Sequence, residues 1–261
     1  MKRKIPITPR EVAESITPDV FQKILKEYEL PSEADSISYH RLYGGIRNAV
    51  FLIKTSEGKY VLTIYKPSPT AKGRVERNLL LYNYLRPKGF FVPEVIRTKK
   101  DNLYLRSFIL GAERFISCHR YIGGRKIFPY GKPEIALVGK MLAKLHHKLP
   151  EFPRTEILRT APLEFSMGAK KTVLHMDFAR GNILFSDDNH ISAVLDFEGA
   201  AWGYPIIDIA KSLAIISKDN QELPRGEIKD TFIEQYLSVA KNITGMEQLD
   251  NLISDFQEEI V

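Results

Sequence analysis

The chain has 261 residues, 44% of them hydrophobic, so it is long enough to bury a sizeable core in one or two domains. No apolar run approaches the roughly 20 residues of a membrane helix, and the basic start, residues 1–6, is not followed by the apolar segment of a signal peptide. The single cysteine, Cys118, excludes an internal disulfide and a metal site built from several thiolates. We therefore expect a cytoplasmic protein that does not associate with a membrane.

The net charge of +6 is unevenly distributed. Residues 1–111 hold 20 Lys or Arg and 11 Asp or Glu, a balance of +9, whereas residues 112–261 hold 18 against 21, a balance of −3. A basic front half suits nucleic acid, an acidic membrane surface or a polyphosphate ligand. No aromatic-basic RNA motif or zinc knuckle accompanies the charge, so nucleic acid is not the expected partner.

The front half predicts a small, mostly antiparallel domain. Thr17 and Pro18 are typical of the cap and first residue of a helix. Alternating apolar strands and glycine turns follow, and the last of these strands stops near residues 106–111. We place the crossing into a second domain there, so that the domains span 1–107 and 108–261. The predicted elements are a helix over 18–29, strands over 36–43, 48–55 and 59–65, a helix over 71–85, and a hairpin of 94–98 with 103–108.

The second domain is predicted to be mainly helical. Segment 114–132 is rich in loop-forming and basic residues, and it is either an exposed connection or part of an acceptor site or lid. Beyond it, apolar residues recur on one face of each helical segment. The predicted helices span 134–147, 206–216 and 228–240, and short buried strands span 172–174, 183–185 and 191–195.

The most informative stretch is 173–198. Asp177 and Asn182 lie in a loop between two apolar strands, and Asp196 ends the next strand. Phosphoryl transfer from ATP requires one carboxylate that accepts a hydroxyl proton, and an Asn and a second carboxylate that hold Mg²⁺ on the phosphates. Such oxygen ligands suit Mg²⁺ and not zinc or copper. We predict Asp177 as the general base and Asn182 and Asp196 as metal ligands, although each residue alone would be explained as a cap or turn residue.

Two further residues of this loop have alternative roles. His175 is expected to hold the loop by hydrogen bonds and not to act as a second base. Arg180, three residues after Asp177, is a second catalytic candidate because it would neutralise charge on the moving phosphoryl group. The alternative is that Arg180 only forms an ion pair with Asp187, Asp188 or Glu198.

The ordered set resembles the aminoglycoside phosphotransferase, choline kinase and homoserine kinase superfamily. The similarity includes the 175–182 loop, Gly203 to Ala210, the helix Val138 to His146, and the turn and strand Gly44 to Phe51. This resemblance implies an α+β, two-lobed protein-kinase-like fold with an antiparallel-sheet N-lobe and a mainly helical C-lobe. It implies ATP and Mg²⁺ as cofactors and a small-molecule hydroxyl as acceptor. Asp208 is then expected to pin the catalytic loop and not to bind metal.

The resemblance also implies nucleotide contacts in the front half, with departures from the family pattern. Thr63 occupies the strand position where many relatives carry a Lys or Arg, and Asn78 aligns with its partner Glu. Met176 stands where the family most often has Gly. The nucleotide-binding candidates are Gly44, Gly45, Arg47, Thr63 and Lys66, with Ser107, Phe108 and Ile109 at the crossing for adenine; Arg47, Lys54 or Lys66 would replace the missing cation.

We therefore expect an ATP- and Mg²⁺-dependent phosphotransferase acting on a small amino alcohol, sugar or aminoglycoside-like hydroxyl. The basic segment 114–132 favours a neutral, zwitterionic or anionic acceptor over a polycationic one. The alternative is a nucleotide-binding pseudokinase, in which Thr63 and Asn78 mark lost turnover. A kinase of proteins is a third possibility, but no A-P-E signature follows Asp196. The sequence does not indicate an oligomeric state.

Overall fold

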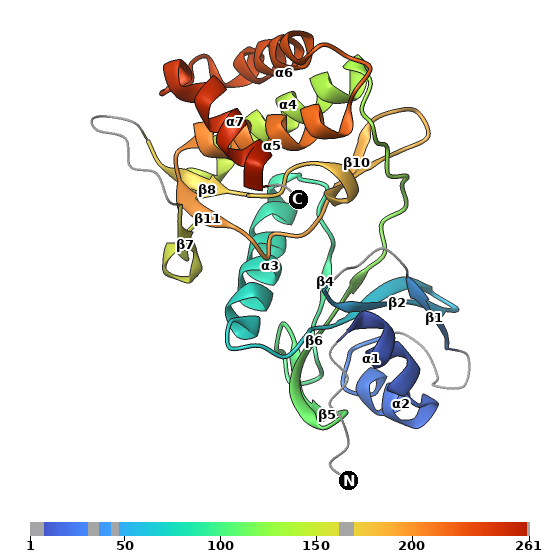
Figure 1. Ribbon diagram of the computed structural model, residues 1–261. Coiled ribbons are helices and arrows are strands. Elements are labelled where there is room, and N and C mark those ends of the chain that lie inside the picture. Colours follow the sequence, from blue (N-terminus) through green and yellow to red (C-terminus); the bar gives the residue numbers. More distant parts are fainter. Residues whose placement is uncertain (1–7, 31–36, 43–46, 162–169, 260–261) are drawn as a thin grey trace. The chain divides into compact units, whose positions relative to one another are not determined.

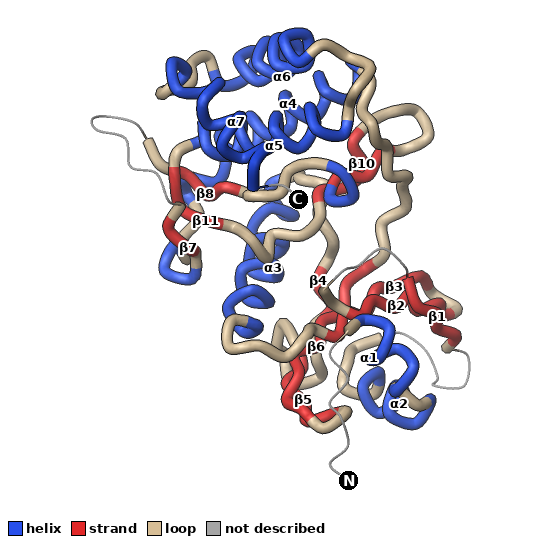
Figure 2. Tube along the Cα trace, viewed as in Figure 1, coloured by secondary structure: helices blue, strands red, loops and turns tan. Residues whose placement is uncertain are grey.

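The computed structural model describes residues 8–30, 37–42, 47–161 and 170–259. The chain forms two compact units, residues 1–88 with 93–122 and residues 89–92 with 123–261. Strands dominate the first unit and helices dominate the second, which confirms the predicted α+β class (Figure 1, Figure 2).

An antiparallel sheet forms the centre of the first unit. In the described part of the chain its strand order is β1-β2-β3-β6-β4, and β5 pairs with β6. The first three strands agree with the sequence prediction, although buried and less buried residues alternate in them only in part, and the last five residues of β3 are all buried. The strands are β1 (Ser38–Leu42), β2 (Ala49–Thr55), β3 (Gly58–Ile64), β4 (Val95–Ile96), β5 (Leu105–Ile109) and β6 (Ala112–Arg120).

Strand β6 was not predicted, and it corrects two expectations. The proposed hairpin of 94–98 with 103–108 is wrong, because β4 and β5 each pair with β6 and not with one another. The crossing was placed at 106–111 because strands seemed to stop there, but the chain remains in the first unit until Ile122. Ser107, Phe108 and Ile109 therefore lie within a hairpin, and Phe108 is 76% exposed.

Helices cover both faces of this sheet. Helix α1 (Pro9–Ser15), which was not predicted, begins with a capping box between Thr8 and Glu11. Helix α2 (Pro18–Leu25) begins at the predicted Thr17 cap but ends earlier than expected. Both lie beside the sheet in Figure 1, and their buried apolar side chains share one core cluster with residues of β2, β3 and β6. Helix α3 (Ala71–Leu85) has the predicted bounds and contacts the other face, where Tyr82 meets the ring of His119.

The second unit is built from helices and two small sheets. Its helices are α4 (Lys132–Lys148), α5 (Pro205–Asp219), α6 (Arg225–Ala240) and α7 (Leu249–Glu259). Its strands are β7 (Arg159–Thr160), β8 (Thr172–Leu174), β9 (Ile183–Phe185), β10 (Ile191–Val194) and β11 (Ala201–Gly203), with order β7-β11-β8 in one sheet and β9 paired with β10 in the other.

Close helix packing supports the second unit. Helices α4 and α6 approach so closely that a Cβ on Gly139 would lie 2.5 Å from the carbonyl oxygen of Phe232. Helix α7, which was not predicted, packs on α5 (Figure 1). Among the described residues, no helix is both long enough and apolar enough to span a bilayer.

Candidate active site

The loop from His175 to Asn182 is fixed by a buried carboxylate. Asp208, at the start of α5, has no solvent exposure. Its two oxygens accept hydrogen bonds from the backbone N–H groups of His175 at 2.6 Å and Met176 at 2.8 Å. Nε2 of His146 on α4 lies 3.1 Å from the same carboxylate. Asp208 therefore holds the start of the loop, as its position in the sequence indicated.

His175 has a structural role in this arrangement. Its Nε2 lies 2.9 Å from the carbonyl oxygen of Leu195, so this nitrogen donates, and its Nδ1 accepts from the backbone N–H of Asp177 at 3.3 Å. One donating and one accepting ring nitrogen define a neutral imidazole with a fixed tautomer. The ring also packs against Phe178 and Phe197. Its nitrogens are committed to the backbone, which supports the expectation that it is not a base.

Asp177 and Asn182 are joined directly. Nδ2 of Asn182 donates to Oδ2 of Asp177 at 2.8 Å and to its carbonyl oxygen at 3.0 Å. This contact orients the carboxylate and leaves the amide oxygen of Asn182 for a cation. The backbone N–H of Leu195 donates to the Asn182 carbonyl at 2.8 Å, extending the β9–β10 pairing by one step. The hairpin thereby brings Asp196 beside Asn182, although 13 residues separate them in the chain.

Three loop residues have left-handed backbone conformations. The φ angles are 69° at Met176, 50° at Arg180 and 62° at Asp196. Residues other than glycine adopt such angles rarely, and they concentrate at functional sites where the surrounding structure compensates for the strain. At Met176 the chain holds a side chain at an angle that glycine would adopt without strain. The hydrogen bond from the Met176 N–H to Asp208 helps to hold the turn.

The partner of Arg180 differs from the prediction. Its guanidinium makes a two-pronged ion pair with Asp219, the last residue of α5, at 2.5 and 2.6 Å. The predicted pairing with Asp187, Asp188 or Glu198 is therefore wrong. Because a paired carboxylate compensates its charge, the geometry favours the ion-pair role over direct action on a phosphoryl group.

The nucleotide-binding candidates of the first unit lie apart from this loop in the chain. Gly44 and Gly45 fall outside the described residues, and Arg47 is exposed just before β2. Thr63 is buried on β3, opposite Val50 and Ser117. Lys66 is exposed beyond the end of β3, and its backbone N–H donates to Asn48.

The residues present fit a Mg²⁺ site of the kind that phosphates complete. Asp196 and Asn182 offer a carboxylate and an amide oxygen at one end of the β9–β10 hairpin. Mg²⁺ keeps several waters and needs only one or two such protein ligands when phosphates are bound. In the described part of the chain, no cluster of three His, Cys, Asp or Glu side chains is arranged to hold a metal by itself.

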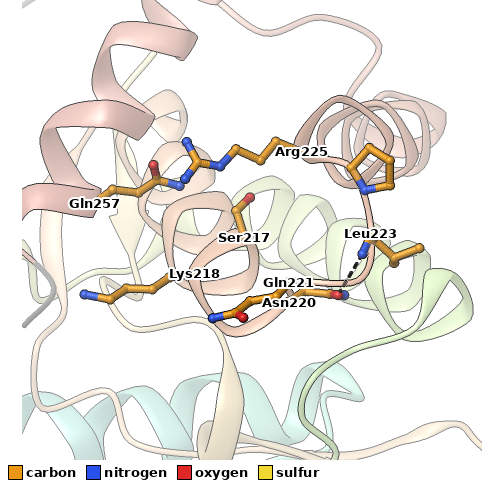
Figure 3. Close-up of a pocket in the computed structure, with 8 residues that line it drawn as sticks. Ser217, Lys218, Asn220, Gln221, Leu223, Arg225 and Gln257 are labelled. Atoms are coloured by element: carbon orange, nitrogen blue, oxygen red, sulfur yellow. Dashed lines mark hydrogen bonds between the residues drawn. The ribbon is translucent and has the colours of Figure 1, made fainter.

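A cavity of about 610 Å³ lies where α5 ends and α6 begins. Arg225 and Gln257 extend toward one another across it from α6 and α7 (Figure 3). Its charged lining residues are Lys218 and Arg225, with no Asp or Glu. The buried Asn220 connects its wall to the loop, because Nδ2 donates to the Tyr130 carbonyl at 2.6 Å and the Tyr130 hydroxyl donates to the Arg180 carbonyl at 3.3 Å.

Comparison with known proteins places this geometry in a family. A model of the phosphotransferase enzyme family matches residues 38–165 and 133–241. The chain belongs to this phosphotransferase family. A homoserine kinase of Granulibacter bethesdensis is 24% identical over 239 residues, which cover 76% of this chain and 70% of that protein.

Solved structures of phosphotransferases share the fold. A microcompartment-associated aminopropanol kinase superposes with a TM-score of 0.73 at 17% identity, covering 92% of this chain and 86% of that one. The amicoumacin kinase hAmiN, solved with AMP-PNP, Ca²⁺ and Ami, gives a TM-score of 0.66 at 13% identity, with coverages of 96% and 95%. The protein-kinase-like fold expected from the sequence is thereby confirmed.

Sequence reasoning missed the residues that hold the family loop from outside it. Asp219 and Tyr130 contact Arg180 from 39 and 50 residues away in the chain, and Asn220 in turn contacts Tyr130. No local pattern distinguishes an aspartate at the end of a helix that pairs with a distant arginine from one that only faces water. The 175–182 motif was found because its residues are adjacent in sequence.

Proposed function

We propose that this protein is an ATP- and Mg²⁺-dependent kinase that transfers the γ-phosphoryl group to a hydroxyl of a small molecule. The observation that carries this proposal is the contact of Asn182 with Asp177 beside Asp196. A base, an amide and a second carboxylate converge there on one loop and hairpin, as phosphoryl transfer requires. The amicoumacin kinase of the same fold was solved with an ATP analogue and a divalent cation, which supports this cofactor choice.

Each residue has a defined task in the proposed reaction. The acceptor oxygen forms a bond to the γ-phosphorus while the bond from that phosphorus to the ADP oxygen breaks, and the hydroxyl proton passes to the Asp177 carboxylate. Asn182 orients that carboxylate, and Asp208 holds the backbone before it. Mg²⁺, held by Asn182 and Asp196, would neutralise phosphate charge. Because the transition state is loose, the base contributes positioning more than proton affinity.

The acceptor is proposed to be a small alcohol that carries an anionic or zwitterionic group. The cavity beside the Arg180–Asp219 pair has Lys218 and Arg225 in its lining and no carboxylate, which disfavours a polycationic aminoglycoside. Homoserine, the substrate named for the Granulibacter relative, combines a hydroxyl with a carboxylate and is the first compound to test.

Substitution of the proposed base tests the function. Asp177→Asn should reduce turnover by ~10²–10⁴-fold, the share of a positioned acid–base group, and leave nucleotide affinity nearly unchanged. Turnover is measured as Mg²⁺-dependent phosphorylation of homoserine and a panel of amino alcohols and sugars, and as slow ATP hydrolysis without acceptor. Asp230→Asn, an exposed aspartate on α6, is the control.

Two results would reject the proposal in different ways. Equal turnover in Asp177→Asn and wild type would remove Asp177 from its catalytic role. Tight nucleotide binding without hydrolysis, and without phosphorylation of any alcohol in the panel, would favour the pseudokinase alternative.

A further inference from the structure

A lysine from the segment that leads into the second unit lies against the loop of the proposed active site. A Cβ placed on Gly181 would be 3.0 Å from Nζ of Lys126, 3.3 Å from its Cε and 3.4 Å from its Cδ. The end of the lysine side chain therefore runs across this glycine. Gly181 directly precedes Asn182. An ammonium group is thus placed beside a proposed metal ligand.

The backbone next to this lysine is fixed on the β9–β10 hairpin. Arg125 and Phe185 exchange two backbone hydrogen bonds of 2.8 and 2.9 Å. Gly124, with φ at +157°, lies so close to the hairpin that a Cβ there would be 2.4 Å from Oγ of Ser192 and 2.9 Å from Cβ of Leu184. The same hairpin carries Asn182 and Asp196 at its ends. The position of Lys126 relative to these two residues is therefore set by backbone contacts and not only by a flexible side chain.

The transferring phosphoryl group requires a cation near the loop that is not already paired with a carboxylate. The transferring group carries several negative charges, and phosphotransferases oppose them with cations. Arg180, the cation within the loop itself, is compensated by Asp219. Among the residues that the structure describes, Lys126 has no ion-pair partner.

We propose that Lys126 binds the γ-phosphoryl group of ATP and opposes its negative charge. This inference rests on the proposed kinase function. Lys126 acts only as an N–H donor to the non-bridging oxygens, and no proton moves to or from it. Because Lys126 lies in the second unit beside Gly181, its contact belongs to the end of the nucleotide that reacts. Its effect should therefore distinguish ATP from ADP.

Nucleotide affinities test this distinction without relying on turnover. Calorimetric titrations with Mg²⁺ and either a non-hydrolysable ATP analogue or ADP are made on wild type, Lys126→Ala and Lys126→Arg at low ionic strength. Lys126→Ala should lower the affinity for the ATP analogue about tenfold and change the affinity for ADP less than twofold. Lys126→Arg should restore most of the loss. Lys140→Ala, an exposed lysine on α4, is the matched control and should change neither affinity.

A second variant tests the geometry. A methyl group in Gly181→Ala would meet the lysine ammonium and displace it, so this variant should weaken the ATP analogue in the same direction. Because both substitutions act on one contact, the double variant Lys126→Ala with Gly181→Ala should bind the ATP analogue more tightly than the product of the two single fold-losses in affinity predicts.

Each other outcome would overturn the assignment. If Lys126→Ala lowered the affinities for ADP and for the ATP analogue equally, Lys126 would contact the nucleotide away from the γ-phosphoryl group. Unchanged affinities would make Lys126 an ordinary surface lysine and leave the kinase proposal intact. A wild-type protein that binds neither nucleotide would reject both the kinase function and this inference.

Discussion

Asp208 is the residue on which the loop of the proposed active site depends most. Burial acts to raise the pKa of its carboxyl group, but the hydrogen bonds that it accepts from His146 and from the backbone N–H of His175 outweigh burial and leave this pKa below its ordinary value. A carboxyl whose pKa is lowered by folding stabilises the protein above the pKa it has when unfolded, about 3.9. This stabilisation is lost as the pH falls through the lower folded value.

Asp208→Asn should therefore destabilise the protein in a pH-dependent way. The amide places an NH₂ group where the carboxylate accepted from a backbone N–H, so we expect a loss of about 3 kcal/mol in the free energy of unfolding at pH 7. The difference from wild type should shrink as the pH falls below about 4. Urea unfolding at several pH values measures it, with Asp230→Asn as the exposed control. A constant difference down to pH 2 would contradict the role of the ionised carboxylate.

At the scale of single residues, the sequence predicts candidates that are recognisable from their spacing to nearby residues in the chain. The proposed roles of Asp177, Asn182 and Asp196 rest on their spacing, and the hydrogen bonds of His175 support its expected structural role in the loop. The ion pair of Arg180 was assigned to the wrong partner because its choice depends on where α5 ends in space. The place of Lys126 was also beyond sequence reasoning, since it depends on how residues 123–126 pair with a hairpin far along the chain.

The helices and strands were predicted where their burial pattern is simple. Helix α3 has the expected bounds because proline and glycine follow it in the sequence, and β1 to β3 are short segments that turn-forming residues separate in the sequence. Strand β6 was missed because its charged residues resemble those of a loop, yet Arg114 within it is fully buried. A buried arginine in a central strand contradicts the usual association of charge with exposure. The strand is recognised only from the structure, in which β3, β4 and β5 pair with it.

The packing of α4 on α6 gives a prediction at the scale of elements. Replacing a helical glycine by alanine ordinarily stabilises a helix by up to about 1 kcal/mol. At Gly139 the added Cβ would lie 2.5 Å from the backbone of Phe232, so α6 would have to move. We expect Gly139→Ala to destabilise the protein by about 1–3 kcal/mol.

Gly226, in the first turn of α6, is the matched control. No atom lies within 4 Å of a Cβ placed there, so Gly226→Ala should leave stability unchanged or raise it by up to about 1 kcal/mol. Thermal or urea unfolding of both variants measures the difference. Equal effects at the two positions would show that α6 can move away from α4 without a loss in the free energy of unfolding.

At the scale of the whole molecule, each compact unit buries a core of its own. In the first unit α1 and α2 close over the sheet, and in the second α4 and α5 contact β8, while α6 packs on α4 and α7 packs on α5. The two units also contain different probes, because the chain has one cysteine and one tryptophan. Cys118 lies on β6 and Trp202 on β11.

These two probes test whether the units unfold separately. Cys118 is fully buried and burial raises the pKa of its thiol, so a thiol reagent should label it only after the first unit opens. Trp202 fluorescence reports the second unit. Because each unit has its own core, Gly139→Ala should move the Trp202 transition to lower urea and leave the Cys118 labelling transition in place.

The reciprocal variant is Tyr28→Phe. It removes a buried hydroxyl that donates to the Ile116 carbonyl at 2.6 Å in the first unit. It should cost about 1 kcal/mol, moving Cys118 labelling to lower urea without changing the Trp202 transition. If either variant moved both transitions by the same amount, the two units would unfold as one cooperative body. Asp208→Asn would then also destabilise the first unit, which carries the nucleotide-binding candidates.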